Sequence, residues 1–189
     1  IGESEVTQNL WELIMDTNPS FFKGDLLPVD NVSHREIENF LNRLNARYGI
    51  KFRLPTEKEW EWAASGGNKS KSFKYSGNNQ LSKVGWYINN SNNSTHKVKN
   101  LDSNEIGLFD MSGNVWEWCV DQYGKLPVSS YNAPFLDTPK LDISRGYVLR
   151  GGSITNRASV LRSAERDYLA PDHNRNHNVG FRVARTLPS

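Results

Sequence analysis

Four histidines and one cysteine are the side chains of this sequence that could bind a transition metal or act as a nucleophile. His173 and His177 lie four residues apart, a spacing that on a helix puts two metal ligands on one face. They occur in Pro-Asp-His-Asn-Arg-Asn-His, a composition typical of a loop, so a metal pair and two solvated loop histidines both stay open. His34 and His96 have no obvious serine or cysteine partner, and the sequence has no nucleophile-elbow pattern. The single Cys119 excludes an intrachain disulfide and is interpreted as a small core residue rather than a reactive thiol.

The composition is that of a globular chain with many asparagines and tryptophans. The 189 residues include 21 asparagines and six tryptophans, and the formal net charge is +2. Asparagine favours turns and left-handed backbone, which predicts much loop. So small a net charge is not the footprint of a nucleic-acid-binding protein, and no apolar run has the length of a membrane span. The chain begins with Ile1 rather than Met, and we expect it to be a piece of a longer protein.

The helix signals lie in the first third of the chain. Two capping boxes, Ser33 with Glu36 and Thr56 with Glu59, predict the starts of two main helices. Their predicted apolar faces comprise Ile37, Phe40, Leu41 and Leu44 in the first helix, and Trp60, Ala63 and Ala64 in the second. A further short helix after Thr7 is expected to bury Leu10, Leu13 and Ile14.

From about residue 68 onward, short aromatic or β-branched runs alternate with Gly, Asn, Ser and Pro, which is typical of strands and turns. The predicted strands cover residues 84–88, 115–120, 147–150 and 180–184. Residues 124–144 and 154–178 are predicted to be long surface loops, and such loops in a compact domain are usually functional. The pattern predicts one α+β domain over residues 1–189, with two helices, small antiparallel sheets and much irregular loop.

Four longer motifs resemble the signatures of one family. They are residues 52–64, 107–118, 148–153 and 180–184, and residues 5–8 and 18–20 match the family's opening part. In this order they resemble the formylglycine-generating-enzyme (sulfatase-modifying factor) superfamily, over nearly the whole chain. The resemblance implies a C-type-lectin-like fold.

The same resemblance bears on catalysis. The formylglycine-generating enzymes oxidise a substrate cysteine and are similar to one another in two cysteines after the Gly-Gly-Ser motif, which align here with Ala158 and Ser163. Without a thiolate at either position, the copper ligands and redox partner of that chemistry are missing. An iron-dependent branch carries its histidine ligands on an additional helical domain that these residues do not include. We therefore expect no enzymatic activity.

Related family members hold calcium near the second motif, and the resemblance makes Asn114 and Glu117 the side-chain ligands. The alternative is an Asx-type turn at Asn114 with Glu117 in a salt bridge. No cofactor is required on either interpretation, and calcium as a structural ion stays open.

Residues 150–183 combine a framework with positions of no consistent chemistry. The framework positions are Gly151, Gly152, Arg162, Ser163, Ala164, Arg166, Pro171, Gly180, Phe181 and Arg182. The segment resembles the C-terminal variable region of a variable protein of a diversity-generating retroelement, whose mutagenesis alters template adenines and favours asparagine codons. The expected ligand-binding residues are Ile154, Thr155, Asn156, Ser159, Val160, Glu165, Tyr168, Leu169, Ala170, His173, Asn176 and His177.

The resemblance therefore implies a non-enzymatic protein that displays a diversified surface, about residues 154–178, to a protein or cell-surface ligand. We expect exposure on one face for Ile154, Val160, Tyr168, Leu169 and His173, with bracing by Arg150, Arg162, Arg166 and Arg182 through carbonyls and acids such as Asp110 or Glu117. The expected location is the cell surface, the extracellular space or a virion. Two alternatives stay open: a catalytically degenerate modifying-factor domain with a polar pocket near Ser163 for a peptide or small molecule, and a structural module of a surface assembly.

Overall fold

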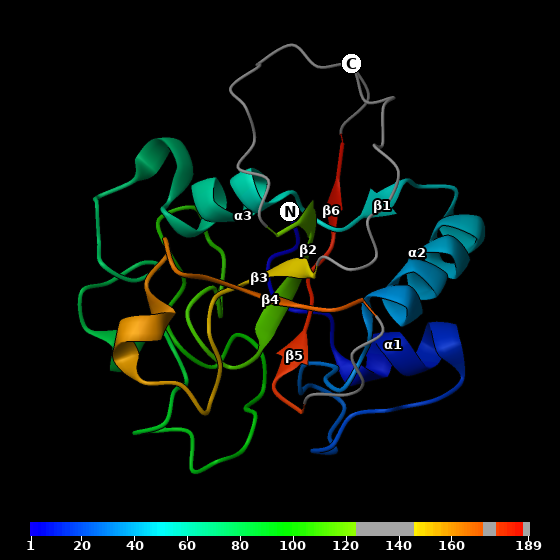
Figure 1. Ribbon diagram of the computed structural model, residues 1–189, viewed down its shortest axis with the longest axis horizontal. Helices are drawn as coiled ribbons and strands as arrows, with labels where there is room; N and C mark the ends of the chain where they lie inside the picture. The colour runs from blue at the N-terminus through cyan, green and yellow to red at the C-terminus, as the bar shows by residue number, and fades with distance from the viewer. Residues whose placement is uncertain (124–145, 172–176, 187–189) are drawn as a thin grey trace.

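The computed structural model describes residues 1–123, 146–171 and 177–186 (Figure 1). Helices α1 (Gln8–Met15) and α2 (His34–Tyr48) pack together on one side of the strands, and α3 (Glu57–Ala64) lies apart from them. Both predicted capping boxes are confirmed: Ser33 and Thr56 accept the amides of Glu36 and Glu59, whose carboxylates accept the N-cap amides. The predicted apolar faces of α2 and α3 are buried as expected.

The short helix after Thr7 is present, but it turns a different face inward. Gln8, Trp11 and Ile14 are its buried residues, whereas Leu13 is 52% exposed. The reason is the Trp11 ring, which stacks on Phe40 with 5.1 Å between ring centroids. Burying this large ring rotates Leu13 into solvent, so the predicted burial of Leu13 was wrong.

The described strands form two small sheets. Strands β4 (Arg166–Leu169), β3 (Tyr147–Arg150), β2 (Trp116–Gln122) and β5 (Val179–Gly180) lie in that order, and β1 (Phe52–Arg53) pairs with β6 (Ala184–Arg185). All neighbours are antiparallel except β2 and β5, so the expected small antiparallel sheets are present with one parallel pair added.

Two strand and loop predictions are also corrected. Residues 84–88 form no strand and instead follow a 3₁₀ turn, η2 (Leu81–Lys83). Two similar turns are η1 (Gly67–Lys69) and η3 (Ala158–Leu161). The predicted loop 154–178 contains η3 and β4, because β4 completes the hydrogen-bonded edge of β3. The predicted loop 124–144 lies outside the described residues.

The core lies on both faces of the four-stranded sheet. Trp116 and Trp118 pack with α1 and α2, whereas Cys119 from the same strand packs with Trp60 of α3. This follows from the period-2 alternation of side chains along a strand, and it confirms that the two rings share one side. The N-terminal segment lies beside the C-terminal one, since the Gly2 and Val6 amides donate to the carbonyls of Val183 and Phe181.

Candidate functional site

A buried ion pair lies between the sheet and α3. Arg182 donates from Nε to Glu117 Oε2 at 2.7 Å and from Nη2 to Oε1 at 2.8 Å, and both residues are fully buried. The Trp60 indole donates to Glu117 Oε2 at 2.7 Å, and Arg182 also donates to the carbonyls of Gly2 and Phe109. The predicted bracing role of Arg182 is confirmed.

Two more buried acids lie near this pair. Burial raises the pKa of Glu5 well above its usual value, and it raises the pKa of Asp110 to about 6. Arg182 opposes these shifts, but one guanidinium cannot neutralise three carboxylates. Both carboxyls are therefore easier to protonate here than in water.

The donor set of the expected calcium site does not fit a metal ion. Both Glu117 oxygens already accept bonds from Arg182 or Trp60. Asn114 Oδ1 accepts the His96 amide, and Asn114 Nδ2 donates to Glu5 and to the His96 carbonyl. The salt-bridge alternative for Glu117 is thus present. Within residues 1–123, 146–171 and 177–186, no group of three histidine, cysteine or acidic residues is arranged for a metal.

Arg150 and Arg166 form a second network, with α3. Glu57 accepts from Arg150 Nη1 at 2.9 Å and from Arg166 Nη2 at 2.6 Å, and Arg150 Nη2 donates to Glu61 and to the Ser163 carbonyl, both at 2.7 Å. Arg150 is 1% exposed. These two arginines brace the segment as predicted, whereas the exposed Arg162 lies 3.9 Å from Glu165.

Five of the predicted ligand-binding residues are exposed: Thr155, Ser159, Tyr168, Ala170 and His177. Asn156 and Glu165 are half-buried. His173 and Asn176 lie outside the described residues, so the idea of a His173–His177 metal pair stays a prediction.

Three predicted exposed anchors are not on the surface. Ile154 is fully buried, with its amide bonded to the Asn114 carbonyl and its own carbonyl accepting from Ser91 Oγ. Val160 and Leu169 are half-buried and pack against the hydrophobic core. Their positions in η3 and β4 turn them inward, so the expected exposed cluster of Ile, Val and Leu was wrong. Only Tyr168, 53% exposed, remains an exposed anchor among the described residues of that cluster.

The exposed candidates lie near two different parts of the scaffold. Asn178 Nδ2 donates to Thr155 Oγ1 at 3.0 Å, and the next residue toward the N-terminus, His177, contacts the Phe21 ring at 5.3 Å between centroids. Tyr168 instead stacks on Tyr123 at 4.3 Å.

The positions aligned with the catalytic cysteines carry no thiol. Ala158 is half-buried at the start of η3, and Ser163 is buried. Cys119 is fully buried in the cluster around α3, and burial raises the pKa of its thiol well above the usual value. Its interpretation as a core residue is confirmed.

The remaining two histidines are held by neighbouring rings. His34 is buried against Tyr147, 3.7 Å between centroids, and burial lowers its pKa to about 4. His96 stacks on Trp86 at 3.7 Å, and one of its ring nitrogens lies 2.8 Å from the Ser91 carbonyl. These contacts give both rings packing roles.

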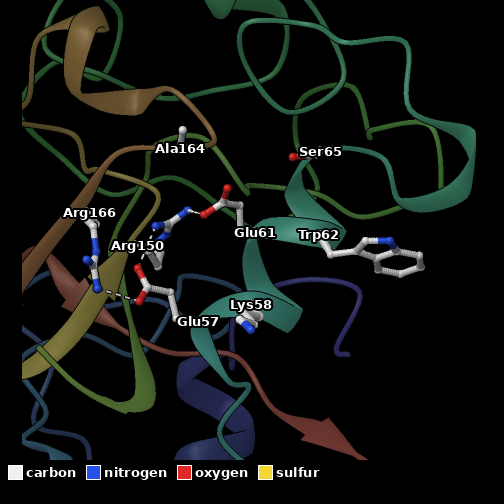
Figure 2. Close-up of a pocket in the computed structure, with 8 residues that line it drawn as sticks. All are labelled: Glu57, Lys58, Glu61, Trp62, Ser65, Arg150, Ala164 and Arg166. Carbon is white, nitrogen blue, oxygen red and sulfur yellow. Dashed lines mark hydrogen bonds and ion pairs between the residues drawn. The ribbon is translucent and has the colours of Figure 1, made fainter. Parts of the chain in front are cut away.

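A pocket of about 510 Å³ lies against α3 (Figure 2). A polar pocket near Ser163 was one alternative that the sequence left open, but the residues that line this one were not predicted. Helix α3 and the residue after it supply Glu57, Lys58, Glu61, Trp62 and Ser65. The other lining residues are Arg150, Ala164 and Arg166. None of the ten predicted ligand-binding residues that the structure describes lines it. The one signal in the sequence was the pair of acids Glu57 and Glu61 on one helix face, followed by a second tryptophan.

Asp30 orders the loop that contacts His177. Its side chain is fully buried; Oδ1 accepts the Phe21 amide at 2.8 Å, and Oδ2 has no partner among the described residues. Burial raises the pKa of Asp30 from 3.8 to about 7. The neutral carboxyl is therefore the favoured form in the folded protein at mildly acidic pH.

The first prediction is that Asp30→Asn abolishes the pH dependence of stability that the Asp30 carboxyl causes. Because the folded pKa of about 7 exceeds the ordinary 3.8, the folded state holds the proton more tightly. This stabilisation is complete below about pH 4 and is lost as the pH rises through 7. Urea unfolding from pH 4 to 8 is expected to show the wild type losing free energy of unfolding relative to Asp30→Asn. The exposed Asp25→Asn, in the same loop, is the control; a pH-independent difference for Asp30→Asn contradicts the prediction.

Among the described residues, the helices are too short or too polar to cross a membrane.

Comparisons with known proteins agree with these features. A model of the sulfatase-modifying factor enzyme 1-like domain matches residues 3–187. The formylglycine-generating enzyme of Streptomyces coelicolor is 35% identical over 174 residues, covering 83% of this chain and 52% of that protein. The inactive C-alpha-formylglycine-generating enzyme 2 of Bos taurus is 35% identical over 81 residues, covering 38% of this chain and 27% of that protein. The relatives thus include an enzyme and an inactive protein.

A solved structure, Treponema denticola variable protein 1, superposes on this chain with a TM-score of 0.84 and 32% identity, covering 98% of this chain and 83% of that one. The chain spans 21% to 60% of the length of three curated relatives that it matches. Sequence motifs, fold and comparisons agree, and the chain belongs to the family of sulfatase-modifying factor enzyme 1-like domains with a C-type-lectin-like fold.

Proposed function

We propose that this chain is a non-enzymatic ligand-binding protein, a variable protein of a diversity-generating retroelement, that displays residues 154–177 to a protein or cell-surface molecule. The observation that carries this proposal is the exposure pattern of the segment. Thr155, Ser159, Tyr168, Ala170 and His177 face solvent, whereas the residues that hold them, such as Ile154, Leu161 and Asn178, are buried. The similarity to Treponema denticola variable protein 1 supports it.

Binding by such a surface is physical rather than catalytic. The Asn156 side chain accepts bonds from the backbone amide and hydroxyl of Ser153, at 2.9 and 2.7 Å, and Asn178 bonds to Ser153 and Thr155. A loop fixed in this way loses little conformational entropy when a ligand binds. Hydroxyl, imidazole and phenol groups then supply adaptable hydrogen bonds and a rigid aromatic contact, as in antibody loops.

The apolar part of this surface is smaller than the sequence suggested, because Ile154 is buried. Tyr168 supplies one exposed ring, and Phe21, 67% exposed beside His177, supplies another from outside the segment. A ligand that covers His177 therefore also contacts Phe21.

The absence of catalysis is part of the proposal. Neither Ala158 nor Ser163 can provide a thiolate, and the Cys119 thiol is buried with a raised pKa. The proposed location, outside the cell or on a virion, follows from the proposed ligand class.

A second candidate function has its own observation. The pocket against α3 lies next to Ser163 and contains Glu57 and Glu61, as expected for a degenerate modifying-factor domain that binds a peptide or small molecule. A single chain can hold both sites, since the pocket contains none of the exposed candidates.

The second prediction concerns tolerance to variation. A library randomised at Thr155, Ser159, Tyr168, Ala170 and His177 is expected to yield mostly folded, protease-resistant members, because these side chains face solvent. A matched library at five buried residues, Ile154, Leu161, Ser163, Asn178 and Arg150, is expected to yield few, since one buried truncation alone costs about 2–5 kcal/mol. Equal loss of folding in both libraries contradicts the proposed division.

The third prediction concerns the gene. A non-coding near-copy of the segment's coding sequence is expected nearby, differing only at adenines and accompanied by a reverse-transcriptase gene. Sequencing of the locus checks this. If the locus carries neither, the retroelement assignment falls, while the library still tests whether the exposed positions tolerate variation.

The fourth prediction concerns activity. Copper-treated protein is expected to leave the cysteine of a peptide substrate unconverted, as measured by mass spectrometry, under conditions in which the Streptomyces coelicolor enzyme forms formylglycine. Ala158→Ser and Ser163→Ala are the control variants. A trace of converted peptide that is only background is expected to be the same in both variants and in the wild type. Conversion by the wild type above that background overturns the non-enzymatic proposal.

A further inference from the structure

The pocket against α3 has an unusual internal charge balance. Its lining carries three cationic side chains and two acidic ones. The acids are already matched: both Glu57 oxygens accept from arginines, and Glu61 accepts from Arg150 at 2.7 Å. The lining therefore has a net positive charge.

The unmatched charge belongs to Lys58. Its side chain is exposed, and no ion pair or hydrogen bond joins it to another described residue. Arg166 adds donor capacity, because its bond to Glu57 uses only Nη2 while its guanidinium lies 4.9 Å from the Tyr123 ring. A cationic ligand is repelled here, whereas an anionic group finds donors without breaking an existing pair.

An aromatic surface lies next to this charge. Trp62 is 59% exposed, and it follows Lys58 by four residues on α3, so the two side chains are neighbours on one helix face. Figure 2 shows Glu57 and Glu61 directed toward the arginines, while Trp62 projects outward on the other side of Lys58 in this view. An exposed ammonium and an exposed indole four residues apart on one helix suit a carboxylate attached to an apolar or aromatic group.

Ser163 precedes the lining residue Ala164 but does not itself line the pocket. Its Oγ is buried and has no partner among the described residues, while its carbonyl accepts from Arg150. The pocket volume of about 510 Å³ is enough for one or two amino-acid side chains.

We propose that this pocket binds a carboxylate, with Lys58 as its principal charge partner and Trp62 as the packing surface for the adjoining apolar group. The carboxylate comes from an aspartate or glutamate side chain of a peptide, or from a small aryl carboxylate. The proposal rests on the second function above and deepens it by naming the ligand class.

The test is an amide and indole NMR titration of the full chain with three probes. They are N-acetyl-Phe-Glu-amide, the matched N-acetyl-Phe-Gln-amide, and phenylacetate. The fifth prediction is that the Glu probe shifts the signals of Lys58, Trp62 and Ser65 and binds at least fivefold more tightly than the Gln probe. Phenylacetate binding as tight as the Glu probe assigns the site to small carboxylates instead of peptides.

Charge variants make the prediction sharper. Lys58→Gln is expected to weaken the Glu probe at least fivefold, and Lys58→Glu is expected to reverse the preference toward N-acetyl-Phe-Lys-amide. Lys51→Gln, an exposed lysine before β1, is the control for net charge. The proposal is wrong if both carboxylate probes leave the α3 signals unmoved, or if Lys58→Gln binds them as the wild type does.

The two functions fail separately in this design. Substitution of Thr155, Ser159 and His177 is expected to leave the probe-induced shifts unchanged, because these residues do not line the pocket. Loss of probe binding in that variant shows that the pocket is not independent of the exposed residues. A titration in which the wild type binds no probe contradicts the pocket proposal and says nothing against binding by the exposed residues.

Discussion

The buried ion pair between Glu117 and Arg182 is the interaction on which the rest of this structure depends. Two opposite charges removed from water are stable only if each is fully partnered. Here the Trp60 indole donates to Glu117, and Arg182 donates to the carbonyls of Gly2 and Phe109, so the ion pair ties α3, the start of the chain and the loop before β2 to the sheet. Burial raises the pKa values of the nearby Glu5 and Asp110 carboxyls, which makes both easier to protonate than in water.

A second arginine pair defines the other end of the candidate segment. Arg150 at the end of β3 bonds to Glu57 and Glu61, and Arg182 bonds to Glu117, and both guanidiniums are buried. The segment between Arg150 and Arg182 is therefore held at each end by a buried ion pair. The exposed side chains of its described residues take no part in either pair. This separation explains how a surface could change its chemistry at Thr155 or His177 while the backbone that presents it keeps its own contacts.

The sequence was sufficient where the signal is local. Capping boxes at Ser33 and Thr56 involve residues three apart, and both helices begin where they predict. Burial of Ile154 was not predictable in this way, because it depends on Asn114 and Ser91, which reach it only through the tertiary fold. The residues that line the pocket were not predicted for the same reason: the contact between Arg150 and Glu57 joins residues 93 positions apart. The parallel pairing of β2 with β5 likewise depends on the return of the chain after residue 171.

The geometry of β4 connects the exposed surface with the pocket. Arg166 and Tyr168 are two residues apart on a strand, so they share one face, and Leu169 turns to the core on the other. Tyr123 joins them, with its ring 4.9 Å from the Arg166 guanidinium and 4.3 Å from the Tyr168 ring. Replacing Tyr168 removes a stacking neighbour of Tyr123. It leaves the Arg166–Glu57 ion pair intact, because Arg166 forms that pair with α3 and not with Tyr168. The cationic side chains of the pocket, Lys58, Arg150 and Arg166, thus lie outside the exposed candidate positions, and the contacts around them can differ from one binding surface to another.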